Sequence, residues 1–225
     1  MSVLPVVAID GPSGSGKSTV GRGVARALGL EVLDTGAMYR AVTLAALEAG
    51  VDLSDAGALA ALAERSSIEP GDRVLLDGRD VTVAIRGPEV TATVSTVSAH
   101  PPVRAELVAR QRAWVDRHGG GVVEGRDIGT VVFPDAPVKV FLTASEQERA
   151  RRRQRDEAAA ERVVDVDAVQ ADIARRDAID AARAASPMAI ADDALVIDTT
   201  GRPVDGIVAE IVERFRRATS RARAR

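Results

Sequence analysis

The chain contains no cysteine and only two histidines, His100 and His118. A disulfide and a thiolate metal site are therefore excluded, and a zinc site is not expected because neither histidine has a second one at ligand spacing. Aromatic residues make up 2% of the 225 residues although hydrophobic residues make up 46%, so Val, Leu, Ile and Ala must fill the core. The formal net charge of −3 argues against a nonspecific nucleic-acid binder.

Long apolar runs and signal sequences are also missing. No stretch approaches the roughly 18 apolar residues of a membrane-spanning helix. The opening residues, MSVLPVVAID, lack the basic start and the cleavage site of a signal peptide. We therefore expect a cytoplasmic protein with neither a membrane nor a nucleic-acid partner. Lysine is scarce as well, since Lys17 and Lys139 are the only lysines among 30 basic residues.

Short apolar runs alternate with helical patterns along the chain, which is typical of an α/β fold. Strands are predicted at Val6–Asp10, at residues 31–33, within GGVVEGRDIG, at 138–144 and within DALVIDTTG. Helices are predicted after the first strand, at about 37–49 and at 204–217, and two more meet at Pro101-Pro102. The Asp77-Gly78 pair predicts a hairpin in a small inserted subdomain, and the last eight residues are expected to be disordered. These patterns favour a doubly wound parallel sheet.

The stretch GPSGSGKST fits the pattern G-x-x-x-x-G-K-[ST] between a predicted strand and a predicted helix. In such a loop the backbone N–H groups surround a phosphate, Lys17 reaches the β- and γ-phosphates, and Ser18 holds Mg²⁺. The expected nucleotide-binding residues are Gly11, Pro12, Ser13, Gly14, Ser15, Gly16, Lys17, Ser18 and Thr19. This motif alone leaves open a motor, a switch protein, a transporter or a small-molecule kinase, although no N-K-x-D element of a switch GTPase is present.

Three further clusters carry arginine near predicted strand ends: DTGAMYR, EGRDIG and the row Arg176, Asp180 and Arg183. The spacing of the last three places them on one helix face. Taken alone, that row favours a solvated ion-pair ladder. Together the clusters favour a site for a second phosphate, because one guanidinium group can bind two oxygens of a phosphate at once. A kinase for a hydroxyl acceptor and a nucleotide-dependent switch remain alternatives.

On IDGPSGSGKST, LDTGAMYRAV, VRAELVARQRAW, EGRDIGTVVFPDAPVKVFL and RRDAIDAARAASP, in this order, the chain resembles the bacterial cytidylate kinases of the nucleoside monophosphate kinase group. The resemblance implies one P-loop kinase domain over residues 1–225, with a five-stranded parallel sheet and helices on both faces. Its core would comprise about 1–35, 94–148 and 166–217. A monophosphate-binding insert would span about 36–93, a short mobile lid about 149–165 and a basic tail 218–225.

The resemblance also implies a monomer that phosphorylates CMP and dCMP to CDP and dCDP, with ATP and Mg²⁺. Glu124 would join Ser18 at the metal, although family members often carry Asp at the position of Glu124. Implied catalytic residues are Lys17, Arg126, Arg183 and, from the lid, Arg149 and Arg153. Implied monophosphate ligands are Thr35, Arg40, Arg126 and Arg183. Arg176 and Asp180 would bind the sugar, Tyr39 would pack near the base or the sugar, and Ser95, Arg104 and Asp127 would read the cytosine.

Overall fold

The computed structural model describes residues 4–159 and 165–223. Five parallel strands form a sheet in the order β2-β6-β1-β7-β8, which confirms the predicted parallel sheet. The strands are β1 (Val6–Asp10), β2 (Val32–Asp34), β6 (Gly121–Gly125), β7 (Val138–Thr143) and β8 (Leu195–Asp198). Because β1 is central and paired on both sides, the loop that follows it starts from a fixed point at the carboxyl edge of the sheet.

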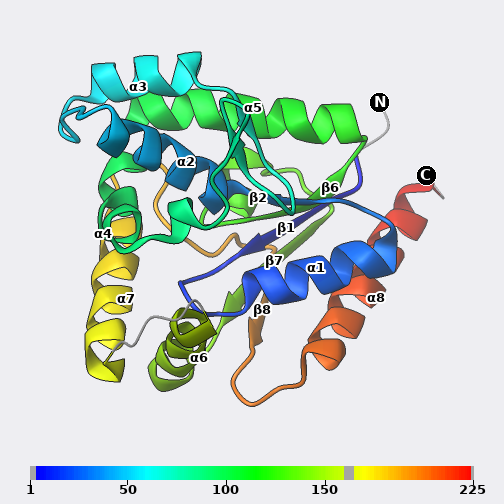
Figure 1. Cartoon of the computed structure of the whole chain (residues 1–225). Coiled ribbons are helices and arrows are strands. Elements are labelled where there is room, and N and C mark those ends of the chain that lie inside the picture. Colours follow the sequence, from blue (N-terminus) through cyan, green and yellow to red (C-terminus); the bar gives the residue numbers. More distant parts are fainter. Residues whose placement is uncertain (1–3, 160–164, 224–225) are drawn as a thin grey trace.

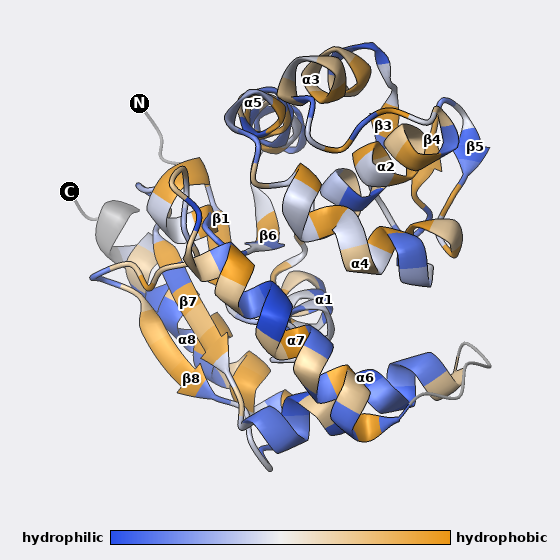
Figure 2. Ribbon diagram, turned by 90° about the vertical axis from the view of Figure 1, so that its left-hand side faces the viewer, coloured by the Kyte–Doolittle hydropathy of each residue, from blue (hydrophilic) through white to orange (hydrophobic). Residues whose placement is uncertain are grey.

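Helices cover both faces of this sheet (Figure 1). One face carries α1 (Lys17–Leu28) and α8 (Val204–Arg223), and the other carries α2 (Thr35–Glu48) and α5 (Pro101–His118), with α3 (Ala56–Arg65) packed outside them. Successive strand residues point to opposite faces. Val7 and Ile9 accordingly join the core beneath α1 and α8, whereas Val6 and Ala8 join the core beneath α2 and α5. Hydrophobic colour runs along β7 and β8, while α6 is mostly hydrophilic (Figure 2).

A second, three-stranded sheet lies within the predicted insert. Its strands β3 (Ile68–Glu69), β4 (Leu75–Leu76) and β5 (Arg79–Asp80) are antiparallel, so the predicted hairpin is confirmed. Asp77 and Gly78 have φ values of 50° and 79°, as a tight two-residue hairpin turn requires. The short helix η1 (Ala84–Arg86) and α4 (Pro88–Val97) follow, and together with the small sheet they pack against α2.

The remaining elements are the π-helical turn η2 (Ile128–Val132), α6 (Glu146–Ala159) and α7 (Val166–Ala181). Residues 160–164 of the predicted lid lie outside the described residues. The predicted helix end at residue 217 is wrong, because α8 continues to Arg223. Phe215 and Ala218 pack against the core beneath that helix, and arginine and alanine are good helix formers. No helix within 4–159 or 165–223 is long and apolar enough to cross a membrane.

Candidate active site

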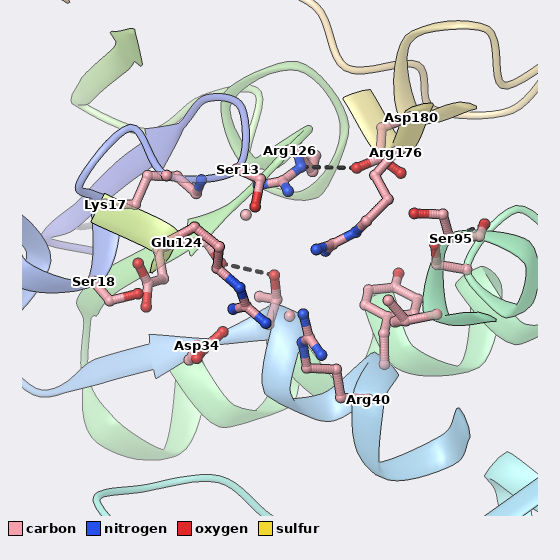
Figure 3. A pocket seen from close by; sticks show the side chains of 18 of the residues that line it. Ser13, Lys17, Ser18, Asp34, Arg40, Ser95, Glu124, Arg126, Arg176 and Asp180 are labelled. Carbon is pink, nitrogen blue, oxygen red and sulfur yellow. Dashed lines mark hydrogen bonds and ion pairs between the residues drawn. The ribbon is translucent and has the colours of Figure 1, made fainter. Parts of the chain in front are cut away.

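A cavity of about 360 Å³ opens at the carboxyl edge of the parallel sheet, where open α/β folds bind ligands. Nine arginines and Lys17 line it, against five carboxylates. Such an excess of cations suits a highly charged anion. The cavity extends from the loop after β1 to α4 and α5, and Figure 3 shows Lys17, Ser18 and Glu124 at one end and Ser95 at the other.

The loop after β1 depends on glycine at three positions. Gly11 has a φ of +145°, and a Cβ there would lie 2.1 Å from the carbonyl oxygen of Leu142. Gly14 and Gly16 have φ values of +77° and +93°, which side-chain-bearing residues rarely adopt. Of the nine predicted nucleotide-binding residues, Gly11, Pro12 and Ser15 are buried. The cavity is lined by Ser13, Gly14, Gly16, Lys17, Ser18 and Thr19.

Lys17 is the first residue of α1, and its ammonium group folds back onto the loop. It donates to the carbonyl oxygens of Gly11 at 2.8 Å and Pro12 at 2.7 Å. Desolvation, together with the positive charge of Arg126, lowers the pKa of Lys17 to about 7. The carboxylates of Glu124, Asp177 and Asp10 only partly oppose this lowering. A bound polyphosphate would add negative charge and raise the pKa of Lys17, because opposite charges favour the ionised form.

Glu124 and Ser18 are the two residues that the sequence predicts as metal ligands. Glu124 lies in β6 and is 3% exposed, and its buried Oε2 atom has no hydrogen-bond partner. Burial, and then the charge of Asp34, raises the pKa of Glu124 to about 7, against a hydrogen bond from Ser18. Within the described residues no group of three or more acidic, His or Cys side chains could hold a metal. A Mg²⁺ ion needs no such group, because substrate phosphates and water supply most of its ligands.

An ion-pair network joins the donor loop to the far wall of the cavity. Arg126 donates through Nη1 to the carbonyl of Gly11 at 2.9 Å and through Nε to Asp180 at 2.9 Å. Arg183 pairs with the other oxygen of Asp180 and donates to Ser98 Oγ at 2.8 Å. Burial alone would raise the pKa of Asp180, but Arg126 and Arg183 lower it below its ordinary value.

The predicted helical row of three is only partly correct. Arg176 and Asp180 lie on α7, but that helix ends at Ala181, and Arg183 reaches the cavity from the segment after it. The amide of Met188 donates to the carbonyl of Asp180 at 2.9 Å, which turns the chain back at the end of the helix. Pro187 also disfavours a longer helix.

Arg40 and Arg176 point into the cavity from opposite sides (Figure 3). Arg40 donates to the carbonyl of Ile85 at 3.1 Å and to Thr91 at 2.9 Å. Burial, and then the charge of Arg176, lowers the pKa of Arg40 to about 9. Burial followed by the charge of Arg126 lowers the pKa of Arg176 to about 10. These guanidinium groups therefore surround a space in which an anion would relieve their repulsion.

The end of the cavity opposite Lys17 holds a buried ion pair between Arg104 and Asp127. Arg104 also donates to the carbonyl of Ser98 at 3.3 Å, and its guanidinium carbon lies 5.4 Å from the ring centre of Tyr39. Burial raises the pKa of Asp127 above its ordinary value, although Arg104 opposes this. Ser95 is 2% exposed and lines the same end. At this end of the cavity Arg104 and Ser95 can donate hydrogen bonds and Asp127 can accept one, so a planar polar group could bind there.

The other predicted residues occupy different positions. Thr35 is buried and donates to the main-chain carbonyl of Glu124 at 2.7 Å. Arg153 lines the cavity and pairs with Glu157. Arg149 lies behind the phosphate loop, where it pairs with Asp177 and donates to the carbonyl of Ser13 at 3.1 Å.

Sequence reasoning missed several residues of this site. Arg152 lines the cavity and bonds to both oxygens of Thr199, at 2.8 and 2.9 Å. Asp177 accepts the N–H of Ser13 at 3.1 Å. Asp34 lines the cavity and caps α2 by accepting the N–H of Ala37 at 3.0 Å. Only Asp34 had a usable signal, because it follows an apolar strand at the edge where the phosphate loop begins.

A family model described as cytidylate kinase matches residues 7–217 of the chain. The cytidylate kinase of Mycolicibacterium paratuberculosis is 53% identical over 221 residues, which cover 96% of this chain and 95% of that protein. The cytidylate kinase of Corynebacterium glutamicum is 52% identical over 212 residues and 92% of each chain. A solved structure of an uncharacterized protein from Eubacterium ventriosum shares the fold, with a TM-score of 0.52, 13% identity and coverage of 93% and 97%.

Proposed function

The chain belongs to the cytidylate kinase family, and on this basis we propose that it transfers the γ-phosphate of ATP to CMP or dCMP, giving ADP and CDP or dCDP. One observation carries this proposal: a single cavity is lined at one end by the phosphate loop and at the other by the Arg104–Asp127 pair. A donor and an acceptor nucleotide can therefore bind in the same cavity with their phosphates next to each other. Holding two reactants in this way removes much of the entropic barrier to their reaction.

The donor half of the site is the phosphate loop. Its glycine backbone brings N–H groups toward the phosphates, and α1 adds the positive end of its dipole. Lys17 would turn from the carbonyls of Gly11 and Pro12 to the phosphate oxygens. Ser18 and the unpartnered Oε2 of Glu124 would hold Mg²⁺, which when bound neutralises charge on the donor phosphates.

The acceptor half is the arginine cluster. Thr35, Arg40, Arg126 and Arg183 would bind the monophosphate, and Arg176 and Asp180 would bind the sugar. The attacking atom is an oxygen of a phosphate monoester, which is already ionised because its second pKa is near 6. No general base is needed, so the side chains act by aligning the oxygen with the donor and by neutralising charge.

The base would be read by Ser95, Arg104 and Asp127, with Tyr39 beneath the guanidinium group of Arg104. The carboxylate of Asp127 can accept a hydrogen bond from the exocyclic amine of cytosine. Uracil presents a carbonyl oxygen at that position and would face the carboxylate with no proton between them. This difference supports a preference for cytosine nucleotides, because an unpaired buried acceptor is costly.

From the predicted lid, Arg153 lines the cavity and would close over the donor phosphates and exclude water, which would limit hydrolysis of ATP. Arg149 would act from behind the phosphate loop, where it donates to the carbonyl of Ser13. We also propose that the protein works as a monomer in the cytoplasm, where its small-molecule substrates would be found. Neither a nucleic acid nor a membrane is required for this reaction.

The test is an acceptor panel. Purified protein with Mg²⁺ and ATP is given CMP, dCMP, UMP, AMP, GMP or shikimate, and ADP release is followed. We expect release with CMP and dCMP well above the rate with ATP alone. Absence of CMP- and dCMP-dependent release would refute the proposal, and release with shikimate alone would support a hydroxyl-acceptor kinase instead.

A further inference from the structure

Asp10, the last residue of β1, uses its buried carboxylate for a contact outside the substrate cavity. Its two oxygens each accept one backbone N–H: Oδ1 from Ile128 at 2.8 Å and Oδ2 from Gly129 at 2.8 Å. The residue is 4% exposed, so the carboxylate has exchanged water for these two bonds. Bonds to an ionised acceptor are stronger than neutral ones.

This arrangement holds a carboxylate where burial disfavours it. Burial raises the pKa of Asp10 to about 6, although the N–H groups of Gly129 and Ile128 lower it part of the way back. An ionised side chain kept at such a cost has a role that an apolar side chain could not fill. Its partners show where that role lies.

The two N–H groups belong to the start of η2, directly after Arg126 and Asp127. Asp127 itself has φ −145° and ψ 26°, outside both the helical and the strand regions. Its carbonyl accepts the N–H groups of Val131 at 2.9 Å and Val132 at 3.2 Å, so its backbone moves with η2. The other end of η2 is anchored separately, because Arg112 donates to the carbonyls of Val131 and Val132 at 3.0 Å each. The carboxylate of Asp10 therefore anchors the end of η2 nearest the base-reading residue.

Gly129 leaves room for this contact. A Cβ at that position would lie 3.4 Å from Oδ2 of Asp10 and 3.2 Å from Cδ of Lys139. A methyl group there would crowd the lysine stem and touch the carboxylate, and a larger side chain would displace one of them. The glycine thus allows the backbone to approach Asp10 closely.

We propose that Asp10 is a positioning residue that fixes Asp127, and through it the acceptor base, relative to the phosphate loop. Asp10 is joined covalently to Gly11, the first residue of that loop, and its backbone is held by strands on both sides of β1. One residue therefore ties the acceptor-reading segment to the origin of the donor loop. This inference rests on the proposed function, because it assumes that Asp127 reads the base of the acceptor.

The test variant is Asp10→Asn, assayed at pH 8, where the wild-type carboxylate is ionised. The amide keeps the size of the side chain but points an NH₂ group at one of the two N–H donors. We expect KM for CMP to rise by about tenfold and the preference for CMP over UMP to narrow. KM for ATP should change by less than about twofold, because the pairing of β1 holds Gly11 in place. The melting temperature should stay within a few degrees, since the variant also removes a desolvated charge.

Two further variants separate positioning from general stability. In an Asp127→Ala background, Asp10→Asn should change KM for CMP by less than about twofold, because its effect passes through Asp127. Gly129→Val should give a CMP-selective loss from the other side of the contact, because a branched side chain does not fit between the carboxylate of Asp10 and the stem of Lys139. The matched control is Asp52→Asn, whose carboxylate accepts the N–H of Ser54 at 2.8 Å in an exposed turn; it should leave all parameters unchanged.

The outcomes are distinguishable. Equal losses for CMP and ATP, or a full effect of Asp10→Asn that persists without Asp127, would overturn the positioning role and leave the proposed function intact. If Asp10→Asn does not fold, an unchanged KM for CMP in Gly129→Val would overturn it as well. Failure of the wild-type protein to use CMP or dCMP would overturn both proposals.

Discussion

In the absence of substrate, Arg40 and Arg176 place two guanidinium groups in one cavity, and Arg176→Leu should therefore stabilise the empty protein while impairing its use of CMP. Arg176 is 5% exposed, and its buried Nε has no hydrogen-bond partner. Its pKa is lowered to about 10 by burial first and then by Arg126. A group whose charged form is disfavoured in the folded state reduces the stability of the fold.

The size of the effect follows from that pKa. Lowering the pKa from its ordinary value to about 10 corresponds to a penalty on the order of 3 kcal/mol on the charged form. This penalty already includes the attraction of Asp172 and Asp180. Leucine removes the penalty but gives up packing of the longer arginine stem, so we expect a net gain of about 1 kcal/mol. For a chain of this length that is a rise of roughly 2–4 °C in Tm. Because the penalty is present at every pH below about 10, the gain should be the same from pH 6 to pH 9.

The assay is thermal or urea unfolding of both proteins, with and without CMP, followed by steady-state kinetics. CMP should raise the Tm of the wild type more than that of Arg176→Leu. Its phosphate relieves the repulsion between Arg40 and Arg176, which is absent from the variant. The control is Arg175→Leu, which changes a neighbouring arginine whose side chain is 47% exposed and should leave CMP use unchanged. If Arg176→Leu unfolds earlier than the wild type in the absence of CMP, Arg176 is a structural ion-pair partner and the reasoning is wrong.

Three other variants or conditions test the site. Arg183→Ala should lower kcat/KM for CMP by about a hundredfold or more while ATP binding changes little, and an early thermal transition would show a structural role instead. Asp127→Ala should raise KM for CMP more than KM for ATP, and equal losses would contradict a role in base reading. Since the pKa of Lys17 is lowered to about 7 and phosphates should raise it, ATP binding without Mg²⁺ at pH 8 should take up protons in calorimetry in two buffers. ATP affinity should also fall as pH rises above 7. Lys17→Arg should abolish the proton uptake, and an unchanged uptake would show that Lys17 is not the group that takes up the proton.

The sheet was predictable because strand and helix patterns are local. Short apolar runs predicted the five strands, and the run at Val6–Asp10 matches β1 in full. Boundaries set by tertiary contacts were not predictable. The end of α7 before Arg183 depends on how the following segment folds back toward Asp180, and the extension of α8 depends on where Phe215 and Ala218 pack.

The candidate site divides in the same way. Residues in motifs at strand ends, such as Lys17 and Asp127, were predicted because the fold brings all carboxyl ends of the strands together. In the run of arginines on α6, the face of each depends on the phase of that helix. Burial of Ala150 against Ile173 sets that phase, and it directs Arg149 behind the loop and Arg152 along it. No local pattern contains this information.

Arg126 shows why a site so rich in arginine can do without a general base. It bonds to Gly11 at the start of the donor loop and to Asp180 on the acceptor side, so it lies between the two halves of the proposed site. Negative charge on the transferring phosphoryl group and on the acceptor oxygen meets there, and a guanidinium group stabilises it without moving a proton. Its position is fixed by two bonds before any substrate arrives. Little reorganisation is then required during the reaction, which is the condition under which fixed charges contribute most to catalysis.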